Sequence, residues 1–165
     1  MSDLVPAAGK RAVAKLGSSD ETRQYVSIVI DGQLFGIPVL IVHDVLGPQR
    51  ITRIPLAPPE VAGSLNLRGR IVTAIDVRLC LGLEKRPAEN PGMSVVVDHG
   101  SEFYSLIVDN VGEVLTLSGA SMERNPATLD PRWREISNGI YRLDDQLLVV
   151  LDADRLLGFA HTEAA

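Results

Sequence analysis

The residues that could carry out chemistry are few and lie far apart along the chain. The three histidines, His43, His99 and His161, have no second histidine or cysteine near them at the spacing that a metal site requires. The single cysteine, Cys80, lies between two leucines, which predicts a buried thiol rather than a catalytic nucleophile. The aspartates of residues 144–154 lack the register of a calcium-binding loop, so turns and a helix cap explain them better. The sequence therefore predicts neither an enzyme nor a bound cofactor or metal.

One arginine is placed where it could serve binding instead. Residues 63–76 read GSLNLRGRIVTAID, in which Arg68 and Gly69 separate two apolar runs. Arg68 could form an ion pair within the fold, with Asp44 or Glu60 as the acidic partner. It could also contact another protein, because Gly69 has no side chain and lets a partner approach the backbone closely. The residues themselves leave both roles open.

Composition restricts the kind of protein that could present this arginine. The 165 residues are 45% hydrophobic and 22% charged, which fits one compact unit or two very small ones. The net charge is −5, so neither nucleic acid nor an anionic membrane surface is an expected partner. No stretch approaches the ~18 apolar residues of a membrane-spanning helix, and residues 1–22 lack the apolar block of a signal peptide. Together with the single cysteine, these features predict a cytoplasmic protein.

The elements that must position these residues are mostly strands. After a polar tail over residues 1–22, with a short helical tendency at 10–16, the chain consists of short β-branched runs separated by Gly, Asp, Asn and Pro, which is typical of an all-β domain. Helical turns are expected at 38–41 and 59–63, and a short helix capped by Asp152 is expected to end at Leu157. The expected strands are 25–30, 34–36, 43–46, 70–77, 93–97, 103–108, 112–117, 140–142 and 146–151.

Two parts of the chain look alike. Residues 27–32 read SIVIDG, and residues 94–100 read SVVVDHG, each with an aspartate-containing turn between apolar runs. Residues 40–46 and 106–115 extend the similarity downstream. This pattern favours two similar small barrels, with coincidence in a valine-rich sequence as the alternative. Apolar side chains at both odd and even positions of 103–108 indicate strands that are covered on both faces.

Four segments occur in an order that resembles a known family. Residues 34–39 read LFGIPV, residues 42–45 read VHDV, residues 63–78 contain NLRG and end in IDVR, and residues 106–115 read LIVDNVGEVL. Ordered matches of this kind run from about residue 25 to 157 and are far more specific than any one motif. On these segments the chain resembles the CheW family of chemotaxis coupling proteins.

The resemblance implies a fold and a domain division. It implies an all-β protein of two SH3-like five-stranded barrels packed side by side, with short helical turns and a short C-terminal helix. The CheW-like domain is expected to span residues 23–158 and to be followed by a tail at 159–165. The first barrel is expected at about 34–92 and the second at about 93–151, with the strand 25–30 as a candidate for sharing between them.

The resemblance also implies a function without catalysis. Proteins of this family are cytoplasmic adaptors at membrane chemoreceptor arrays; they bind the regulatory domain of the histidine kinase CheA and the cytoplasmic tip of a chemoreceptor, and other CheW-like domains in rings are further expected partners. Asp44 stands where the family usually has glutamate, which shortens the reach of that carboxylate. The implied receptor-binding groove comprises Val42, Asp44, Gly63, Arg68 and Val114, and the implied kinase contacts are Ile71 and Val111.

Three other functions are alternatives to this one. A nucleic-acid-binding barrel is disfavoured by the acidic charge balance and by the lack of a basic strand face with interleaved aromatic residues. An enzyme would need a convergent polar cluster, and no motif in the sequence predicts one. The same surfaces would also serve a CheW-like adaptor in a non-chemotaxis kinase pathway, such as surface motility or development, and the sequence does not separate this alternative from chemotaxis.

Overall fold

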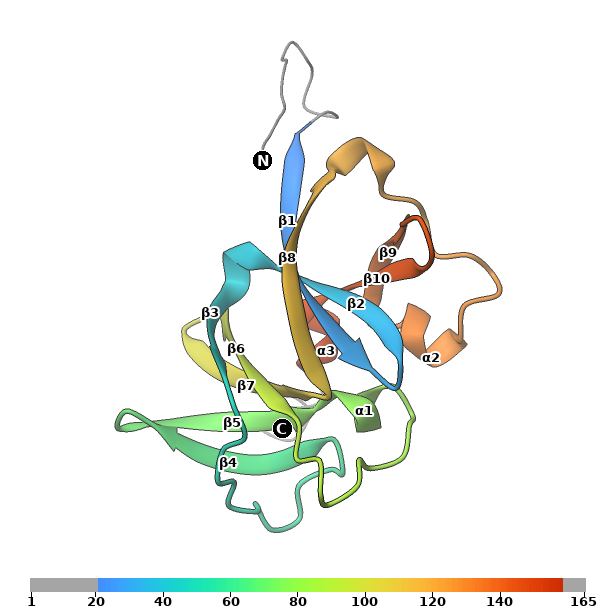
Figure 1. Cartoon of the computed structure of the whole chain (residues 1–165). Coiled ribbons are helices and arrows are strands. Elements are labelled where there is room, and N and C mark those ends of the chain that lie inside the picture. Colours follow the sequence, from blue (N-terminus) through green and yellow to red (C-terminus); the bar gives the residue numbers. More distant parts are fainter. Residues whose placement is uncertain (1–20, 159–165) are drawn as a thin grey trace.

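The computed structural model describes residues 21–158, which form two five-stranded sheets packed against each other (Figure 1). The first sheet has the strand order β8–β1–β2–β10–β9 and the second has the order β3–β6–β7–β5–β4. The expected tail at 159–165 and the helical tendency at 10–16 lie outside the described residues. The strands are β1 (Thr22–Ile30), β2 (Gln33–Pro38), β3 (Val42–Leu46), β4 (Val61–Leu67), β5 (Arg70–Asp76), β6 (Met93–His99), β7 (Glu102–Val108), β8 (Asn110–Ser118), β9 (Ser137–Arg142) and β10 (Leu147–Leu151).

Each sheet takes strands from both halves of the chain. The hairpin β1–β2 is continued by β3, which leaves the first sheet and pairs with β6 in the second. The hairpin β6–β7 is continued by β8, which crosses in the opposite direction and pairs with β1. The sheets therefore do not consist of the continuous ranges 34–92 and 93–151 that were expected for the barrels. A local sequence pattern indicates a strand but carries no information about which distant strand it will pair with.

The internal repeat is confirmed by these matching hairpins and extends further along the chain. In each half, one strand has a bulge near its start, namely β4 in the first half and β9 in the second. Each of these strands also pairs with a single upstream residue, through the bridges Thr52–Ser64 and Glu123–Ile140. Each half then ends in a short helix with an aspartate at its N-cap, Asp76 or Asp152. These bridges link the segment after β3 to β4, and the segment after β8 to β9, so each open sheet curls in the manner of an SH3-like barrel.

The core has three parts, and the main one lies between the two sheets. Strand β10 shows the arrangement, because Val149 and Leu151 belong to the central cluster whereas Leu148 and Val150 point to a smaller cluster on the opposite face. A third cluster fills the corresponding space of the second sheet. The inner strands are thus buried on both faces, as the mixed apolar pattern predicted.

The helical elements are short. The expected helix after Asp152 is confirmed as α3 (Ala153–Leu156), and the expected turn at 38–41 is the 3₁₀ turn η2 (Val39–Ile41). The helical turn expected at 59–63 is wrong, since only a β-turn precedes β4; alternate residues from Val61 to Leu67 face the core, which is a strand pattern. The elements that were not expected are the strand β4 (Val61–Leu67), the helices α1 (Val77–Cys80) and α2 (Pro131–Arg134), and the 3₁₀ turn η3 (Gly119–Ser121).

Candidate functional site

Arg68 occupies the tip of the β4–β5 hairpin. Leu67 pairs with Arg70, so Arg68 and Gly69 are the two residues of the turn, and both have positive φ, 53° and 88°. This is the conformation of a type I′ turn, which normally selects asparagine or glycine at its first position. The Asn66 carboxamide oxygen accepts a hydrogen bond from the Gly69 N–H at 2.8 Å and supports the turn. The asparagine and glycine of the NLRG segment thus build the turn, and local conformation gives no reason for an arginine in it.

The side chain of Arg68 forms an ion pair with Asp44 of β3, with 3.4 Å between Nη2 and Oδ2. Of the two acidic partners considered from the sequence, Asp44 is therefore the one used, and Glu60 pairs with Arg132 instead. The Arg68 side chain remains 73% exposed and that of Asp44 29% exposed. An exposed pair of this kind contributes only about 0–1 kcal/mol to stability. The pair leaves most of the guanidinium free to meet a partner.

Side chains from β3, β5 and β7 form a stack of aromatic and charged groups. The Phe103 ring of β7 stacks against the imidazole of His43 with 4.3 Å between the ring centroids. The Arg70 guanidinium lies over the Phe103 ring, 4.3 Å from its centroid. His43 and Arg70 are exposed, so this stack reaches the surface. Sequence reasoning missed it, because its three members come from β3, β5 and β7.

The remaining predicted site residues occupy different environments. Val114 on β8 is 53% exposed and Ile71 on β5 is 74% exposed, so both present apolar surface to solvent. Val42 and Val111 are half-buried and pack against the central core cluster. These two side chains contribute to the core with one face, and only their exposed edges are available to a partner.

Gly63 is buried, and the structure gives it an internal role. It has φ of 148°, and a Cβ added there would overlap the carbonyl oxygen of Thr52 and lie 2.8 Å from Cγ2 of Ile51. Gly139 is the corresponding glycine in the other half of the chain. It has φ of 158°, and a Cβ added there would lie 2.6 Å from the carbonyl oxygen of Glu123. In both halves, the lack of a side chain on the glycine lets the upstream segment form backbone hydrogen bonds with the strand that contains the glycine. Gly63 thus shapes the hairpin that carries Arg68.

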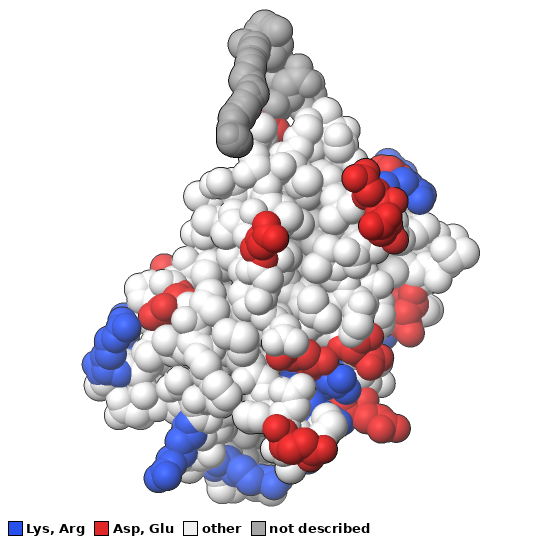
Figure 2. Space-filling view, viewed as in Figure 1, with Lys and Arg blue, Asp and Glu red and all other residues white. Residues whose placement is uncertain are grey.

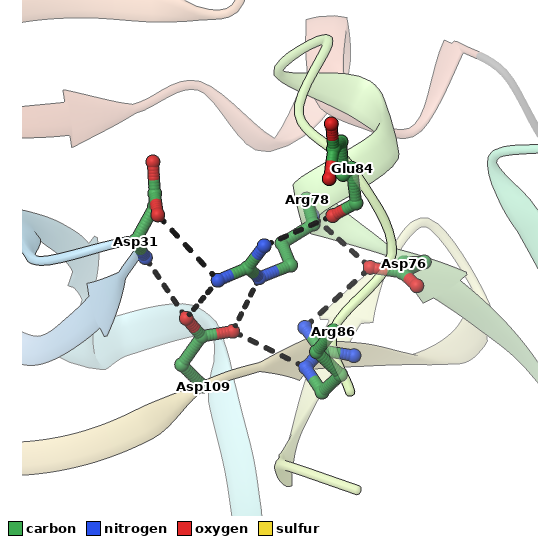
Figure 3. A network of polar contacts seen from close by, with 6 residues as sticks. All are labelled: Asp31, Asp76, Arg78, Glu84, Arg86 and Asp109. Atoms are coloured by element: carbon green, nitrogen blue, oxygen red, sulfur yellow. Dashed lines mark hydrogen bonds and ion pairs between the residues drawn. The ribbon is translucent and has the colours of Figure 1, made fainter. Parts of the chain in front are cut away.

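A buried ionic network holds the two sheets together (Figure 3). Its centre is Asp109, the single residue between β7 of one sheet and β8 of the other. The Arg78 guanidinium donates to both Asp109 carboxylate oxygens, from Nε at 2.9 Å and from Nη2 at 3.0 Å. Arg86 Nε donates to the same carboxylate at 3.2 Å, and the Asp31 N–H in the β1–β2 turn donates at 2.8 Å.

The outer members complete this network. Arg86 lies 3.5 Å from Asp76, which also caps α1 by accepting from the Arg78 N–H, and Arg78 donates to the carbonyl of Glu84. The side chains of Arg78, Arg86 and Asp109 are 14%, 8% and 12% exposed, so little water screens these contacts. The network joins the β1–β2 turn of the first sheet, α1 beside the second sheet, and the β7–β8 junction, where the chain passes from the second sheet to the first.

The network predicts loss of stability in acid. Burial raises the pKa of Asp109, but hydrogen bonds from Arg78, the Asp31 backbone and Arg86 outweigh it and lower the pKa to about 2. An unfolded aspartate has a pKa of about 3.9, so Asp109 contributes about 2–3 kcal/mol above that pH and loses it as the pH falls from about 4 towards 2. Urea unfolding measured from pH 7 to pH 2 should show wild type losing this advantage over Asp109→Asn; a pH-independent difference would contradict the assignment.

The charged side chains are unevenly distributed on the surface. Figure 2 shows Lys and Arg at the end of the β4–β5 hairpin and along the lower edge, whereas Asp and Glu are spread over most of the same face. Within residues 21–158, no group of three or more His, Cys, Asp or Glu is arranged to hold a metal ion. No helix in this described range is long and apolar enough to cross a membrane. Cys80 is buried as predicted, and burial raises the pKa of its thiol.

These observations define a class of protein. Two curled β-sheets, joined by a buried ionic network, present a charged hairpin tip and exposed apolar side chains. This arrangement is that of a protein-binding scaffold domain. Comparison with known proteins identifies the family. The family model described as "CheW-like domain" matches residues 24–160.

Individual relatives agree with the family match. Chemotaxis protein CheW of Klebsiella aerogenes is 27% identical over 150 residues, which cover 91% of this chain and 90% of that protein. Protein PilI of Pseudomonas aeruginosa is 33% identical over 105 residues, covering 62% of this chain and 59% of that protein. The crystal structure of the scaffolding protein TtCheW from Thermoanaerobacter tengcongensis has a TM-score of 0.72 and 29% identity, and the match covers 80% of this chain and 90% of that one. The chain belongs to the CheW family.

Proposed function

We propose that this adaptor couples chemoreceptors to a CheA-type histidine kinase by binding both. The observation that carries the proposal is the family match over residues 24–160, which includes both sheets and the Arg68 hairpin. Family members of this kind bring partners together and do not transform a substrate, so the function depends on surfaces rather than on a catalytic cluster. Binding to membrane receptors would also recruit the protein to the receptor array.

The receptor surface is proposed at Arg68 and at the exposed valine of β8. A receptor helix would lay its apolar stripe against Val114 and the exposed edge of Val42, in the helix-in-groove mode. Arg68 would donate charge-assisted hydrogen bonds to a carboxylate or to carbonyls at the end of a helix. Asp44 would orient the guanidinium through the ion pair. Gly63 would act indirectly, because it lets the hairpin bond to Thr52.

The kinase contacts inferred from the family remain proposals at Ile71 and Val111. Ile71 offers 74% of its surface to a partner, whereas the half-buried Val111 offers only part of one face. A like barrel of the kinase regulatory domain would pack against these side chains. Receptor binding would then bias the kinase between its active and inactive states, because a bound ligand shifts a two-state equilibrium by its difference in affinity.

Replacing Arg68 with alanine should separate binding from stability. We expect Arg68→Ala to weaken binding of a receptor signalling fragment at least tenfold, because one exposed, charged contact is lost. Its free energy of unfolding should change by less than about 1 kcal/mol, because the pair with Asp44 is exposed. Calorimetric titration with the receptor fragment and urea unfolding measure the two quantities.

The matched control is Arg142→Ala, which removes an exposed arginine paired with Glu123 at 3.0 Å in the other sheet. Arg142→Ala should retain both receptor and kinase binding. Equal loss of receptor binding in the two variants would show a general effect of charge and would contradict a specific role for Arg68. Autophosphorylation of the CheA-type kinase from the same organism, with and without receptor fragment, tests the coupling itself: wild type that binds neither partner would refute the proposed function.

A further inference from the structure

The proposed receptor surface takes its residues from both sheets. Val114 lies on β8 of the first sheet, whereas Val42 and Asp44 lie on β3 of the second. Arg68 lies at the β4–β5 turn, which also belongs to the second sheet. A receptor helix that contacts Val114 and Arg68 together therefore requires a defined position of one sheet relative to the other.

The main core cluster and the ionic network both connect the sheets, but they differ in kind. The hydrophobic effect that packs the core cluster is non-directional, so it favours burial more than it selects one relative position. The network is directional, because the Arg78 guanidinium donates hydrogen bonds to the Asp109 carboxylate from both Nε and Nη2. A bidentate pair of this kind fixes orientation as well as distance. The network is thus the contact suited to setting the relative position of the sheets.

The network also lies where it can act on the receptor surface. Asp109 directly precedes β8, the strand that carries Val114. Arg78 lies in α1, which directly follows β5, and the other end of β5 joins the turn that contains Arg68 (Figure 3). The pair between Arg78 and Asp109 therefore ties the start of β8 to the end of β5. Neither residue has to touch the receptor for this connection to matter.

Stability does not by itself explain why these charges are buried. The side chains of Arg78, Arg86, Asp76 and Asp109 are only 8–14% exposed. Removing charges from water can cost more than their pairing recovers, and apolar side chains of similar volume often replace buried ion pairs without loss. In addition, Nη2 of Arg86 is buried and has no hydrogen-bond acceptor among the described residues, which is a further cost. What the network provides beyond its energy is a defined geometry.

We propose that the Asp109 network is a positioning device for the receptor surface. It holds Val114 of the first sheet at the distance from Arg68 of the second that a receptor helix requires. This inference rests on the proposed function, because it concerns the receptor-binding half of that function. Asp109, Arg78 and Arg86 are positioning residues that act through β8 and β5. Without the network, the sheets occupy several relative positions, and receptor binding has to select one of them, which lowers the apparent affinity.

The decisive variant replaces the whole network by uncharged side chains of similar size. It combines Asp76→Asn, which retains the oxygen that caps α1, with Arg78→Met, Arg86→Met and Asp109→Leu. Two charges of each sign are removed, so the net charge stays at −5. We expect a melting temperature no lower than that of wild type, together with an affinity for the receptor fragment that is at least tenfold lower. Thermal unfolding and calorimetric titration measure the two quantities.

The relative position of the sheets can be measured without any partner. Spin labels on Thr116→Cys in β8 and Ile71→Cys in β5 report the distance between the sheets, because both positions are exposed. Cys80 is buried and should not react with the label. Pulsed electron resonance should give one narrow distance when the network is intact. The same labels in the network variant should give a displaced or clearly broader distribution.

The matched control removes an exposed pair of opposite charges. Arg142→Met combined with Glu123→Gln deletes the 3.0 Å pair outside the network and also leaves the net charge at −5. It should keep the receptor affinity within twofold of wild type and should keep the narrow distance. A second network variant, Asp109→Glu, retains the charge but moves the carboxylate by one methylene. It should displace the distance and weaken receptor binding at least threefold.

Three outcomes would overturn the inference. The first is a network variant with wild-type receptor affinity. The second is weaker receptor binding with an unchanged distance between the labels, which would mean that the charges act on the receptor directly. The third is a network variant that melts far below wild type, which would mean that the network serves stability. Failure of wild type to bind the receptor would refute the proposed function itself, and it is distinguished because it appears before any substitution.

Discussion

Removing the carboxylate of Asp109 should cost about 3–5 kcal/mol of unfolding free energy, because two largely buried arginines then lose their shared acceptor. Asp109→Ala leaves Arg78 and Arg86, whose side chains are 14% and 8% exposed, without the group that both contact. A loss of this size is a large fraction of the about 5–15 kcal/mol that stabilises a typical domain. Urea unfolding at pH 7 measures it directly.

An exposed ion pair provides the comparison. Glu123→Ala breaks the pair with Arg142, which has an equally short contact of 3.0 Å but side chains that are 46% and 63% exposed. This variant should lose less than about 1 kcal/mol. If both variants lost the same amount, burial would not be what gives the Asp109 network its strength. Amide hydrogen exchange in Asp109→Ala should further show loss of protection at β8, the strand that follows the substituted residue and crosses between sheets.

Gly63→Ala should destabilise the protein by about 3–5 kcal/mol, since it adds a backbone overlap to a strained conformation. The added Cβ would meet the carbonyl of Thr52, which accepts the Ser64 N–H at 2.8 Å, so relief of the overlap breaks this bridge. Urea unfolding gives the free energy. Receptor binding measured well below the unfolding midpoint shows whether the displaced hairpin still presents Arg68, and it should be weaker than in wild type.

Alanine substitutions at two other glycines distinguish backbone strain from steric overlap as the cause of this destabilisation. Gly69→Ala is matched for positive φ, at 88°, but an added Cβ there has no atom within 4 Å, so it should lose only about 1–2 kcal/mol. Gly139→Ala repeats the overlap in the other half, against the Glu123 carbonyl, and should destabilise as Gly63→Ala does while leaving the Arg68 hairpin in place. A Gly63→Ala protein that loses receptor binding with normal stability would instead place Gly63 in direct contact with the receptor.

Much of the site could be found from the sequence, but its geometry could not. Asp44 was one of two candidate partners for Arg68, and the structure selects it. Whether that pair is exposed depends on how the edges of the second sheet curl towards each other, which no local pattern contains. Leu56 shows the same limit, because a leucine gives no sequence signal for positive φ. The helix α2 was the exception: Asp130 followed by Pro131 is a cap-and-first-turn signal that sequence reasoning passed over.

By itself, the sequence determined the resemblance to the family, the β class and the place of Arg68 in the GSLNLRG segment, and it indicated the internal repeat, because alternation, turn residues and ordered motifs are local and are written in consecutive positions. Only the tertiary structure decided that β3 and β8 exchange between the sheets, and that Asp31, 78 residues away, meets the carboxylate of Asp109. It also decided that Gly63 serves packing and that Leu56 faces solvent. These properties depend on contacts between residues far apart in the chain, and burial, pairing and charge compensation arise only when those contacts form.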